Sequence, residues 1–207
     1  MWKLKADLYF EEDFEKNGAR NLSSTSACGD AKDEKNRNRL LKKYFGNDSY
    51  VCGEQVHGNN IRIVTEADSG KIFPETDGFI TGRKGIILTV FTADCLPVFI
   101  FDKKKKVIGL VHAGREGLRK LIIERALGLF TDKFGSGLSD IRVAIGPHIC
   151  KECYGLDLDK SAEEQIRKAG IAGTRISNSD LCTYTGDFFS YRKSKTPERI
   201  LSAIMMP

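Results

Sequence analysis

The feature that most constrains this chain is a pair of short apolar runs separated by a polar stretch. Residues 85–91 and 96–101 are rich in β-branched and aromatic side chains and too short for ordinary helices, so they predict buried strands. The stretch between them contains Asp94 and Cys95. Pro97 follows, and it favours a bulge or a strand start over an uninterrupted central strand. A polar interruption inside buried sequence indicates a functional site.

A third apolar run, residues 107–111, ends directly in His112-Ala113-Gly114. Asp102 and four lysines separate it from the second run, so we expect the second and third runs to pair as a hairpin. Such a hairpin places a residue that precedes one strand beside a residue that follows the next. The pattern therefore predicts that Cys95 and His112 lie close together at one edge of the sheet.

The rest of the chain interleaves strands and helices, and no stretch has the composition of an interdomain linker. Further strands are expected at residues 3–10, 49–56, 61–64, 79–81, 141–145 and 198–205. Helices are expected at residues 33–45, 118–134 and 159–169. Residues 11–32 are predicted to be a long loop, 66–74 turn-like and 179–194 irregular. We therefore expect one α/β domain over residues 1–207.

Composition excludes several classes of function. The net charge of +5 is mild for 207 residues, and much of it comes from residues 103–106 and one early helix, which indicates solvated surface rather than a nucleic-acid partner. No apolar run approaches the roughly 20 residues that a membrane span needs, and residues 1–5 lack a signal-peptide core. We therefore expect no membrane partner and a cytoplasmic location, with the six cysteines mostly reduced.

Cysteine spacing gives one further motif. Cys150 and Cys153 form a C-x-x-C pair, which is typical of zinc and redox sites, but no second C-x-x-C completes a structural zinc site. Cys28, Cys52, Cys150 and Cys182 are therefore interpreted as small buried or incidental residues.

The chain has three histidines, His57, His112 and His148. His57 and His112 each end a predicted strand beside a small residue, and Cys95 has a comparable position. One cysteine and two histidines are the ligands of a catalytic zinc site, in which a fourth position stays open for water or substrate. A histidine at a strand end also serves as an ordinary hydrogen-bonded group, and the residues alone leave both interpretations open.

A series of motifs in order then marks a resemblance to a known family. They are Gln-Val-His-Gly (55–58), Asp-Gly (77–78), Thr-Ala-Asp-Cys-Leu-Pro-Val (92–98), His-Ala-Gly (112–114), Gly-Pro-His-Ile (146–149), Cys-Tyr (153–154), Cys-Thr (182–183) and Phe-Phe-Ser-Tyr-Arg (188–192), with Asn36-Arg37 less specific. From about residue 20 to the end, the chain resembles the laccase-domain family, named polyphenol oxidoreductases and reinterpreted as purine nucleoside phosphorylases.

The resemblance implies a four-layer α/β/β/α architecture with mixed sheets. It implies a zinc or copper site at His57, Cys95 and His112, and we expect one zinc per chain with Cys95 as its only sulfur ligand. It also implies phosphorolysis of adenosine, inosine and methylthioadenosine, with some adenosine deamination. A purine nucleoside and phosphate are thus the expected partners, bound by a monomer or a homodimer.

Other residues have expected roles around this site. Asp77 and Asp94 are candidates for holding the ligands, with a capping or turn carboxylate as the alternative for Asp94. Arg192 and Arg115 are candidate phosphate donors, with a surface ion pair as the alternative for Arg192. Tyr191 is a candidate substrate contact. His148 has no matched ligand role, so it is expected at a pocket wall or on the surface.

The sequence departs from the family pattern at three places. Where the family has His-Ala-Gly-Trp-Arg-Gly, this chain has Arg115 and Glu116 in place of the Trp and the Arg. Gly155 and Leu156 replace a Glu-Val, and residues 23–29 replace a Ser-Thr-Arg-Gly-Gly block. The three ligand positions are intact, so these departures concern the substrate pocket.

Three alternatives to the nucleoside enzyme follow from the same residues. A multicopper oxidase needs a trinuclear cluster built largely of imidazoles, and the one histidine left over does not suffice, so this alternative is disfavoured. A metal-free hydrolase or acyl transferase would use Cys95 activated by His112, and it leaves His57 without a role. The third alternative is a binding protein that keeps the metal and has lost activity.

Overall fold

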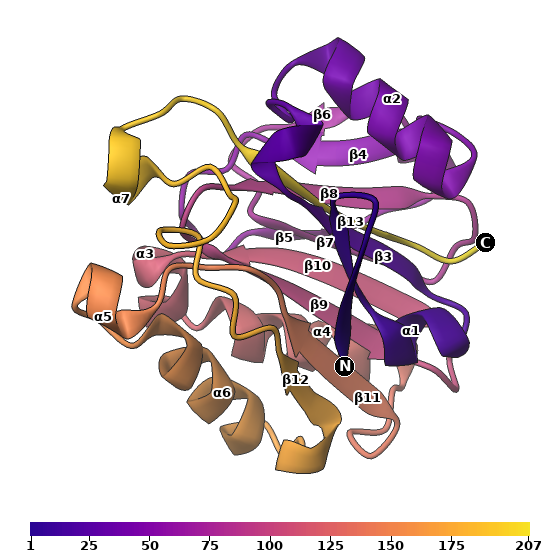
Figure 1. Cartoon of the computed structure of the whole chain (residues 1–207). Helices are drawn as coiled ribbons and strands as arrows, with labels where there is room; N and C mark the ends of the chain where they lie inside the picture. The colour runs from indigo at the N-terminus through magenta and orange to yellow at the C-terminus, as the bar shows by residue number, and fades with distance from the viewer.

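Two mixed sheets stacked face to face form the centre of the molecule (Figure 1). The computed structural model describes residues 1–207, with seven strands in the first sheet and six in the second. Helix α2 (Glu34–Phe45) covers the outer face of the first sheet. Helices α4 (Ile122–Phe134) and α6 (Leu158–Lys168) cover the outer face of the second. The four-layer α/β/β/α architecture implied by the motif resemblance is therefore confirmed.

Each sheet joins strands from distant parts of the chain. In spatial order, the strands of the first sheet are β1 (Trp2–Lys5), β2 (Leu8–Glu11), β3 (Arg20–Ser24), β13 (Ile200–Met205), β8 (Ile87–Thr92), β4 (Tyr50–Gly53) and β6 (Ile72–Phe73). Those of the second are β12 (Ile176–Asn178), β11 (Ile141–Ile145), β9 (Leu96–Asp102), β10 (Val107–Ala113), β7 (Gly78–Thr81) and β5 (Ile61–Ile63). Parallel pairs occur only toward the edges, where β4 lies beside β6 and β8, β5 beside β7, and β12 beside β11.

Short helical turns complete the chain. They are α1 (Glu12–Lys16), η1 (Ser26–Cys28), η2 (Glu66–Asp68), α3 (Arg115–Arg119), α5 (Lys151–Tyr154), η3 (Gly173–Arg175) and α7 (Tyr191–Ser194). None of the helices is long and apolar enough to cross a membrane.

Burial on both faces explains why the central strands have continuous apolar sequence. Val98 and Ile100 of β9 pack toward α4 and α6, whereas Phe99 and Phe101 pack into the layer between the two sheets. Successive side chains of a strand point to opposite faces, so a strand covered on both sides needs apolar residues at every position. The alternation seen in half-exposed strands is therefore absent here.

The predicted hairpin of the second and third apolar runs is confirmed. Strands β9 and β10 pair antiparallel, with Asp102 opposite Val107 and Ala113 opposite Leu96. Pro97 is the second residue of β9 and lies opposite His112, so it occupies the strand start that its missing N–H favours. The hairpin thus brings the turn before β9 to the end of β10.

Two predictions for the N-terminal region are wrong. The expected strand at residues 3–10 is a hairpin, because Ala6 and Asp7 take positive φ values of 50° and 64° and reverse the chain between β1 and β2. The expected loop at residues 11–32 contains α1 and β3. Strand β3 was missed because it is polar yet buried, and Ser23 bonds the Ser202 hydroxyl across the sheet at 2.8 Å.

The expected helix at residues 118–134 is also partly wrong. Leu121 has a φ of 58°, and this left-handed residue separates α3 from α4. The break allows α3 to start at Arg115, directly after the end of β10. The predicted helices corresponding to α2 and α6 and the predicted return of the last strand, β13, to a sheet are confirmed.

Candidate metal centre

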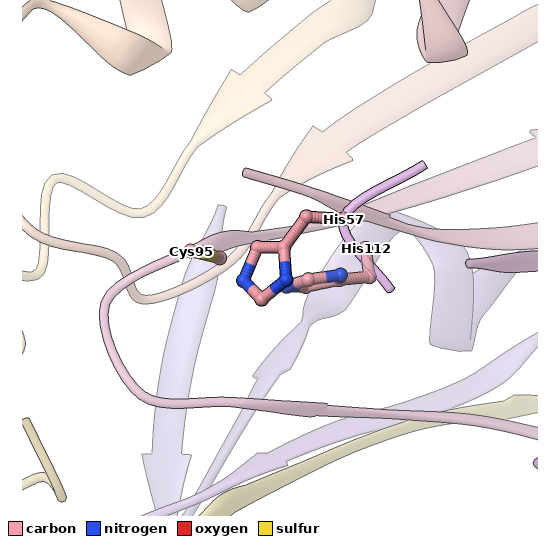
Figure 2. A group of neighbouring side chains, drawn as sticks. All are labelled: His57, Cys95 and His112. Carbon is pink, nitrogen blue, oxygen red and sulfur yellow. The ribbon is translucent and has the colours of Figure 1, made fainter. Parts of the chain in front are cut away.

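Three side chains from separate segments converge at one end of the second sheet. The ligand atoms of His57, Cys95 and His112 all lie within 4.8 Å of one another. The two imidazole rings have centroids 4.8 Å apart and planes inclined at 74°. Figure 2 shows Cys95 and both rings turned toward a common point. The structure therefore brings together the three residues that the sequence analysis selected as metal ligands.

Local backbone geometry places each of them. His57 follows β4 and has a φ of 57°, which turns the chain back at this residue. Cys95 lies in the turn between β8 and β9, after Asp94 with a φ of 98°. His112 is the penultimate residue of β10. Non-glycine residues rarely adopt positive φ, so its occurrence at two places beside the site marks backbone conformations held by tertiary contacts.

Hydrogen bonds to Asp77 fix the positions of two of the three ligand residues. Its carboxylate is fully buried and accepts the N–H groups of His57 at 3.0 Å and Gly58 at 2.8 Å. The same carboxylate lies 2.9 Å from Nδ1 of His112. Burial raises the pKa of Asp77, but the hydrogen bonds from His112, Gly58 and Val56 outweigh burial and lower it overall. An ionised carboxylate accepts only, so His112 donates from Nδ1, and Nε2 is the nitrogen that would bind a metal ion, giving up its proton to do so.

Gly114 leaves room for an ion beside the ligands. A Cβ atom at this position would lie 2.9 Å from Sγ of Cys95 and 3.0 Å from Cδ2 of His57. Any side chain there would therefore push into the space the three ligands enclose. Together with a donor set of two imidazoles and one thiol, this space fits a zinc-type or copper-type ion with an open fourth position.

The metal-free electrostatics favour a thiolate beside a protonated imidazole. Burial raises the pKa of Cys95, but hydrogen bonds from His112 and His57 outweigh it and lower the pKa to about 6. Burial lowers the pKa of His112, but Asp77 and Cys95 outweigh it and raise the pKa to about 9. A thiolate is the form that binds metals and attacks electrophiles.

The three ligands open into a large cavity with a volume of about 850 Å³. Its wall contains six cationic side chains: Lys32, Arg37, Arg115, Arg192, Lys195 and Arg199. Of these, only Arg115 pairs with a carboxylate, that of Glu116. The wall contributes only two carboxylates, Glu54 and Asp94. A cavity with this excess of positive charge favours an anionic ligand.

The three candidate substrate residues all line this cavity. Arg192 lies with its guanidinium 5.5 Å from the ring centroid of Tyr154. Tyr191 is exposed, and Lys195 lies over its ring. Arg115 is held by Glu116, with its Nε 3.3 Å from the Glu116 carboxylate. Arg192 is therefore the more available of the two predicted phosphate donors.

Asp94 takes its alternative role, that of a capping and turn carboxylate, whereas His148 differs from its prediction. The carboxylate of Asp94 accepts the Thr183 hydroxyl at 2.8 Å and the Arg192 N–H at 2.7 Å, so it holds the cavity wall and does not contact the three ligands. The prediction that His148 lies at a pocket wall or on the surface is wrong. His148 is buried, with Nδ1 at 2.9 Å from the Gly146 carbonyl and Nε2 at 3.7 Å from Asp159.

Several cavity residues carried no local indication of their role. Arg37 matched the family only weakly, and Lys32, Lys195 and Arg199 lie in segments whose charge alone is ordinary. Gln55 has a clear role in hindsight, because its amide exchanges two hydrogen bonds of 2.8 Å with the backbone of Phe91 and extends the sheet toward His57.

The departure at Gly155 has a conformational reason. Gly155 ends α5 with a φ of 85°, a left-handed conformation that a glutamate adopts only with strain. Gly155 therefore allows α5 to end here without the strain that a side chain would add.

Comparison with known proteins agrees with the motifs. The family described as multi-copper polyphenol oxidoreductase laccase matches residues 15–156 and 154–207. The chain is 34% identical over 206 residues to the purine nucleoside phosphorylase YlmD of Bacillus subtilis (strain 168), covering 80% of this chain and 74% of that protein. It is 29% identical over 214 residues to the purine nucleoside phosphorylase YfiH of Shigella flexneri, covering 89% and 86%.

Solved structures show the same fold. YlmD from Geobacillus stearothermophilus superposes with a TM-score of 0.92 at 26% identity, covering 99% of this chain and 98% of that one. The hypothetical protein YfiH of Bacillus licheniformis superposes with a TM-score of 0.94 at 23% identity over 100% and 99%, which bears on the fold alone. With a family match over nearly the whole sequence, the chain belongs to the multi-copper polyphenol oxidoreductase laccase family.

Proposed function

We propose that this protein is a metal-dependent purine nucleoside phosphorylase that accepts adenosine, inosine and methylthioadenosine. The observation that carries the proposal is the position of His57, Cys95 and His112 in the wall of a cavity whose charged groups are mainly cations. Three ligands that would leave one coordination position of a metal open thus lie beside cationic side chains that can bind phosphate. The names of the relatives in Bacillus subtilis and Shigella flexneri support the same activity.

In this reaction an oxygen of phosphate attacks C1′ of the ribose while the bond from C1′ to N9 of the purine breaks. The electron pair of that bond leaves with the base, which takes up a proton, and ribose 1-phosphate is the other product. Arg192 is suited to orient the phosphate because its guanidinium pairs with no carboxylate and offers two parallel donors. The rings of Phe91 and Tyr154 line the same cavity and offer flat faces for the purine.

The three ligands prepare the reaction through their charge and orientation. His112 is fixed by Asp77 so that Nε2 faces Cys95, and Cys95 is stabilised as a thiolate. Zinc, or copper in its place, would be held by His57, Cys95 and His112, and when bound it polarises a substrate oxygen or lowers the pKa of a bound water. We also propose a secondary adenosine deaminase activity, in which water would replace the 6-amino group of the purine and ammonia would leave.

The family description makes copper oxidase chemistry the first alternative. This chain has three histidines, of which two are at the centre and His148 is bonded elsewhere. A trinuclear cluster built of imidazoles therefore has no ligands here. We expect phenol oxidation no faster than that given by free copper.

A metal-free thiol hydrolase is the second alternative, and one observation favours it. The Cys95 pKa of about 6 and the His112 pKa of about 9 describe a thiolate–imidazolium pair of the kind found in cysteine hydrolases. The phosphorylase and the metal-free hydrolase differ in how activity responds to a metal chelator. Removal of metal abolishes the phosphorylase and leaves the hydrolase active.

The deciding experiment measures release of adenine from adenosine by the purified protein, with phosphate, with arsenate and with neither. We expect release with either oxyanion and almost none without. A metal-depleted sample should be inactive and should recover when zinc is restored. Equal release without any oxyanion would make the enzyme a hydrolase, and a zinc-loaded protein that releases nothing from any of the three nucleosides would make it a binding protein.

A further inference from the structure

A second group of metal-binding side chains lies outside the site described above. Cys150 and Cys153 form the C-x-x-C pair at the start of α5, and the sulfur of Cys182 joins them from a segment some thirty residues further along the chain. The three Sγ atoms lie within 4.8 Å of one another. In a tetrahedral zinc site, with Zn–S bonds of about 2.3 Å, neighbouring sulfurs are about 3.8 Å apart. The thiols therefore need only a small rotation to enclose an ion.

Backbone hydrogen bonds fix this arrangement before any ion binds. His148 donates its N–H to the Leu181 carbonyl at 3.0 Å, and Thr183 donates to the His148 carbonyl at 2.9 Å. These two bonds clamp Cys182 beside the turn that leads into α5, in a parallel bridge with His148. The N–H of Cys150 points at Sγ of Cys182, 3.3 Å away. The three sulfurs are thus positioned by the fold and not by chance proximity of flexible side chains.

Hydrogen bonds within the group also affect its thiols. Burial raises the pKa of Cys182, but the N–H groups of Cys150, Thr185 and Tyr184 outweigh it and lower the pKa to about 6. The hydrogen bond to Cys182, together with burial, raises the pKa of Cys150 to about 12. At neutral pH the group therefore contains one thiolate that accepts hydrogen bonds from its neighbours. Binding of a divalent ion would release the protons of the other two thiols.

We propose that Cys150, Cys153 and Cys182 form a second metal site, which takes a thiophilic d¹⁰ ion such as Zn²⁺. Three soft sulfur ligands favour such an ion over Mg²⁺ or Ca²⁺. All three cysteines are half-buried, so an ion can reach them from solvent. The proposal differs from the sequence-based interpretation of Cys150 and Cys182 as incidental residues and from the expectation of one zinc per chain, because the fold supplies a third sulfur that the sequence spacing does not show.

The position of this second site suggests what it does. None of its three cysteines lines the large cavity, yet Ile149 and Tyr154 on either side of the C-x-x-C pair do. Thr183, next to Cys182, bonds the carboxylate of Asp94, which in turn holds the N–H of Arg192. An ion at the second site would therefore tie together the segments that form one wall of the cavity, as a structural cross-link.

The test is zinc titration of the full chain kept under reductant, with bound zinc counted after gel filtration. We expect two zinc ions per wild-type chain, one in Cys182→Ser, one in Cys95→Ser and none in the double variant. Cys28→Ser is the matched control, because Cys28 is a buried thiol outside both groups, and it should keep two. A wild type with one zinc that Cys95→Ser loses entirely, or a Cys182→Ser variant that keeps two, would overturn the proposal.

A second measurement needs no variant and so does not depend on the folding of a mutant. Zinc should protect Cys150, Cys153 and Cys182 of the wild-type protein from alkylation, and a strong chelator should remove this protection, as read by peptide mass spectrometry. Cadmium should reproduce the protection and add a cadmium–thiolate absorption band, most of which survives in Cys95→Ser. Alkylation of the three cysteines at the same rate with and without zinc contradicts a metal site. So does recovery of a Cys150–Cys182 disulfide that zinc and reductant do not prevent.

Discussion

The molecule contains two groups of three potential metal ligands. The two groups are equally compact, but they differ in ligand type, in the hydrogen bonds that position them and in access to the cavity. In each group the ligand atoms lie within 4.8 Å of one another. The first group combines two imidazoles with one thiol, is braced by the buried carboxylate of Asp77 and opens into the large cavity. The second consists of three thiols, is braced by backbone N–H groups and lies behind the cavity wall. Compactness alone therefore does not separate a reactive site from a structural one.

Access and bracing separate the two groups. A carboxylate that orients an imidazole keeps one nitrogen free and raises its basicity, which suits a centre that must activate substrate. Backbone N–H groups stabilise a thiolate without presenting any side chain to a ligand, which suits a cross-link. Loss of the first group is thus expected to abolish chemistry, and loss of the second to weaken the scaffold around it.

The largest expected effect tests this division directly. His57→Ala, Cys95→Ala and His112→Ala should each lower nucleoside cleavage by more than about 100-fold, because even residues that only support metal ligands cost 10–100-fold. The double variant of Cys95 and His112 should lose little more than either single one, since residues that act as a unit are not additive. Steady-state rates of adenine release at saturating phosphate provide the measurement.

Cys182→Ser is the matched variant from the second group. It should keep activity within about tenfold of the wild type while the midpoint of thermal unfolding in zinc falls, because loss of a bound ion removes the stabilisation that binding supplies. A folded Cys182→Ser variant that is as inactive as Cys95→Ala would mean that the second group takes part in catalysis. The division into a reactive group and a structural group would then be wrong.

Asp77→Asn should weaken zinc binding at the first group by roughly 10–100-fold. An amide matches the carboxylate in shape but carries no charge, so it no longer stabilises the His112 tautomer in which Nε2 is free. Competition with a chromophoric chelator measures the affinity. Asp94→Asn is the control, because its carboxylate bonds Thr183 and Arg192 and not the ligands. Equal losses of zinc affinity in both variants would show that Asp77 acts only by supporting the backbone.

The two groups also show what the sequence allowed us to predict. The proximity of Cys95 and His112 was predicted because each adjoins a buried apolar strand and the two strands pair as a hairpin. The proximity of Cys182 to the C-x-x-C pair was not predicted, because C-x-x-C spacing carries information only about residues close in sequence. Strand β3 and the break at Leu121 were missed for related reasons: Ser23 is polar yet buried, and a left-handed leucine leaves no mark in the pattern of hydrophobicity.

Thiol titration compares the two groups within one experiment on chelator-treated protein. The pKa of about 6 for both Cys95 and Cys182 means that raising pH from 5 to 7 converts each from thiol to thiolate. Their alkylation rates should rise about tenfold over this range and then level off. Cys150, with a pKa of about 12, should stay slow and still be rising at pH 8. Peptide mass spectrometry gives the rates, and identical profiles for Cys150 and Cys182 would contradict the charge distribution described here.

Gly114→Ala tests the difference between the two groups, because it fills space only beside the ligands of the first group. The new methyl would lie 2.9 Å from Sγ of Cys95, so we expect several-fold weaker zinc binding there and no change at the three thiols. Gly128→Ala is the matched control, because nothing lies within 4 Å of its added Cβ. In the interior of α4 this control should stabilise the protein by about 0.5–1 kcal/mol. Zinc affinity and thermal unfolding separate the two outcomes.

The smallest expected effect concerns the departure of this chain from its family. Arg115→Trp combined with Glu116→Arg restores the family pattern and should hold turnover or raise it a few-fold. The pairs that are lost, Arg115 with Glu116 at 3.3 Å and Arg119 with Glu116 at 2.8 Å, are between exposed side chains, so stability should change by no more than about 1 kcal/mol.

The expected effect of this double change on turnover arises at the cavity wall. The double change replaces one cation by an indole face suited to stacking, and it replaces the carboxylate that pairs with Arg115 by a second donor. Values of kcat and KM for adenosine and for phosphate, measured on both single variants and the pair, assign the effect. A tenfold or greater fall in turnover confined to Arg115→Trp would mean that Arg115 itself contacts the substrate. This chain would then have replaced an aromatic contact of its family by a charged one.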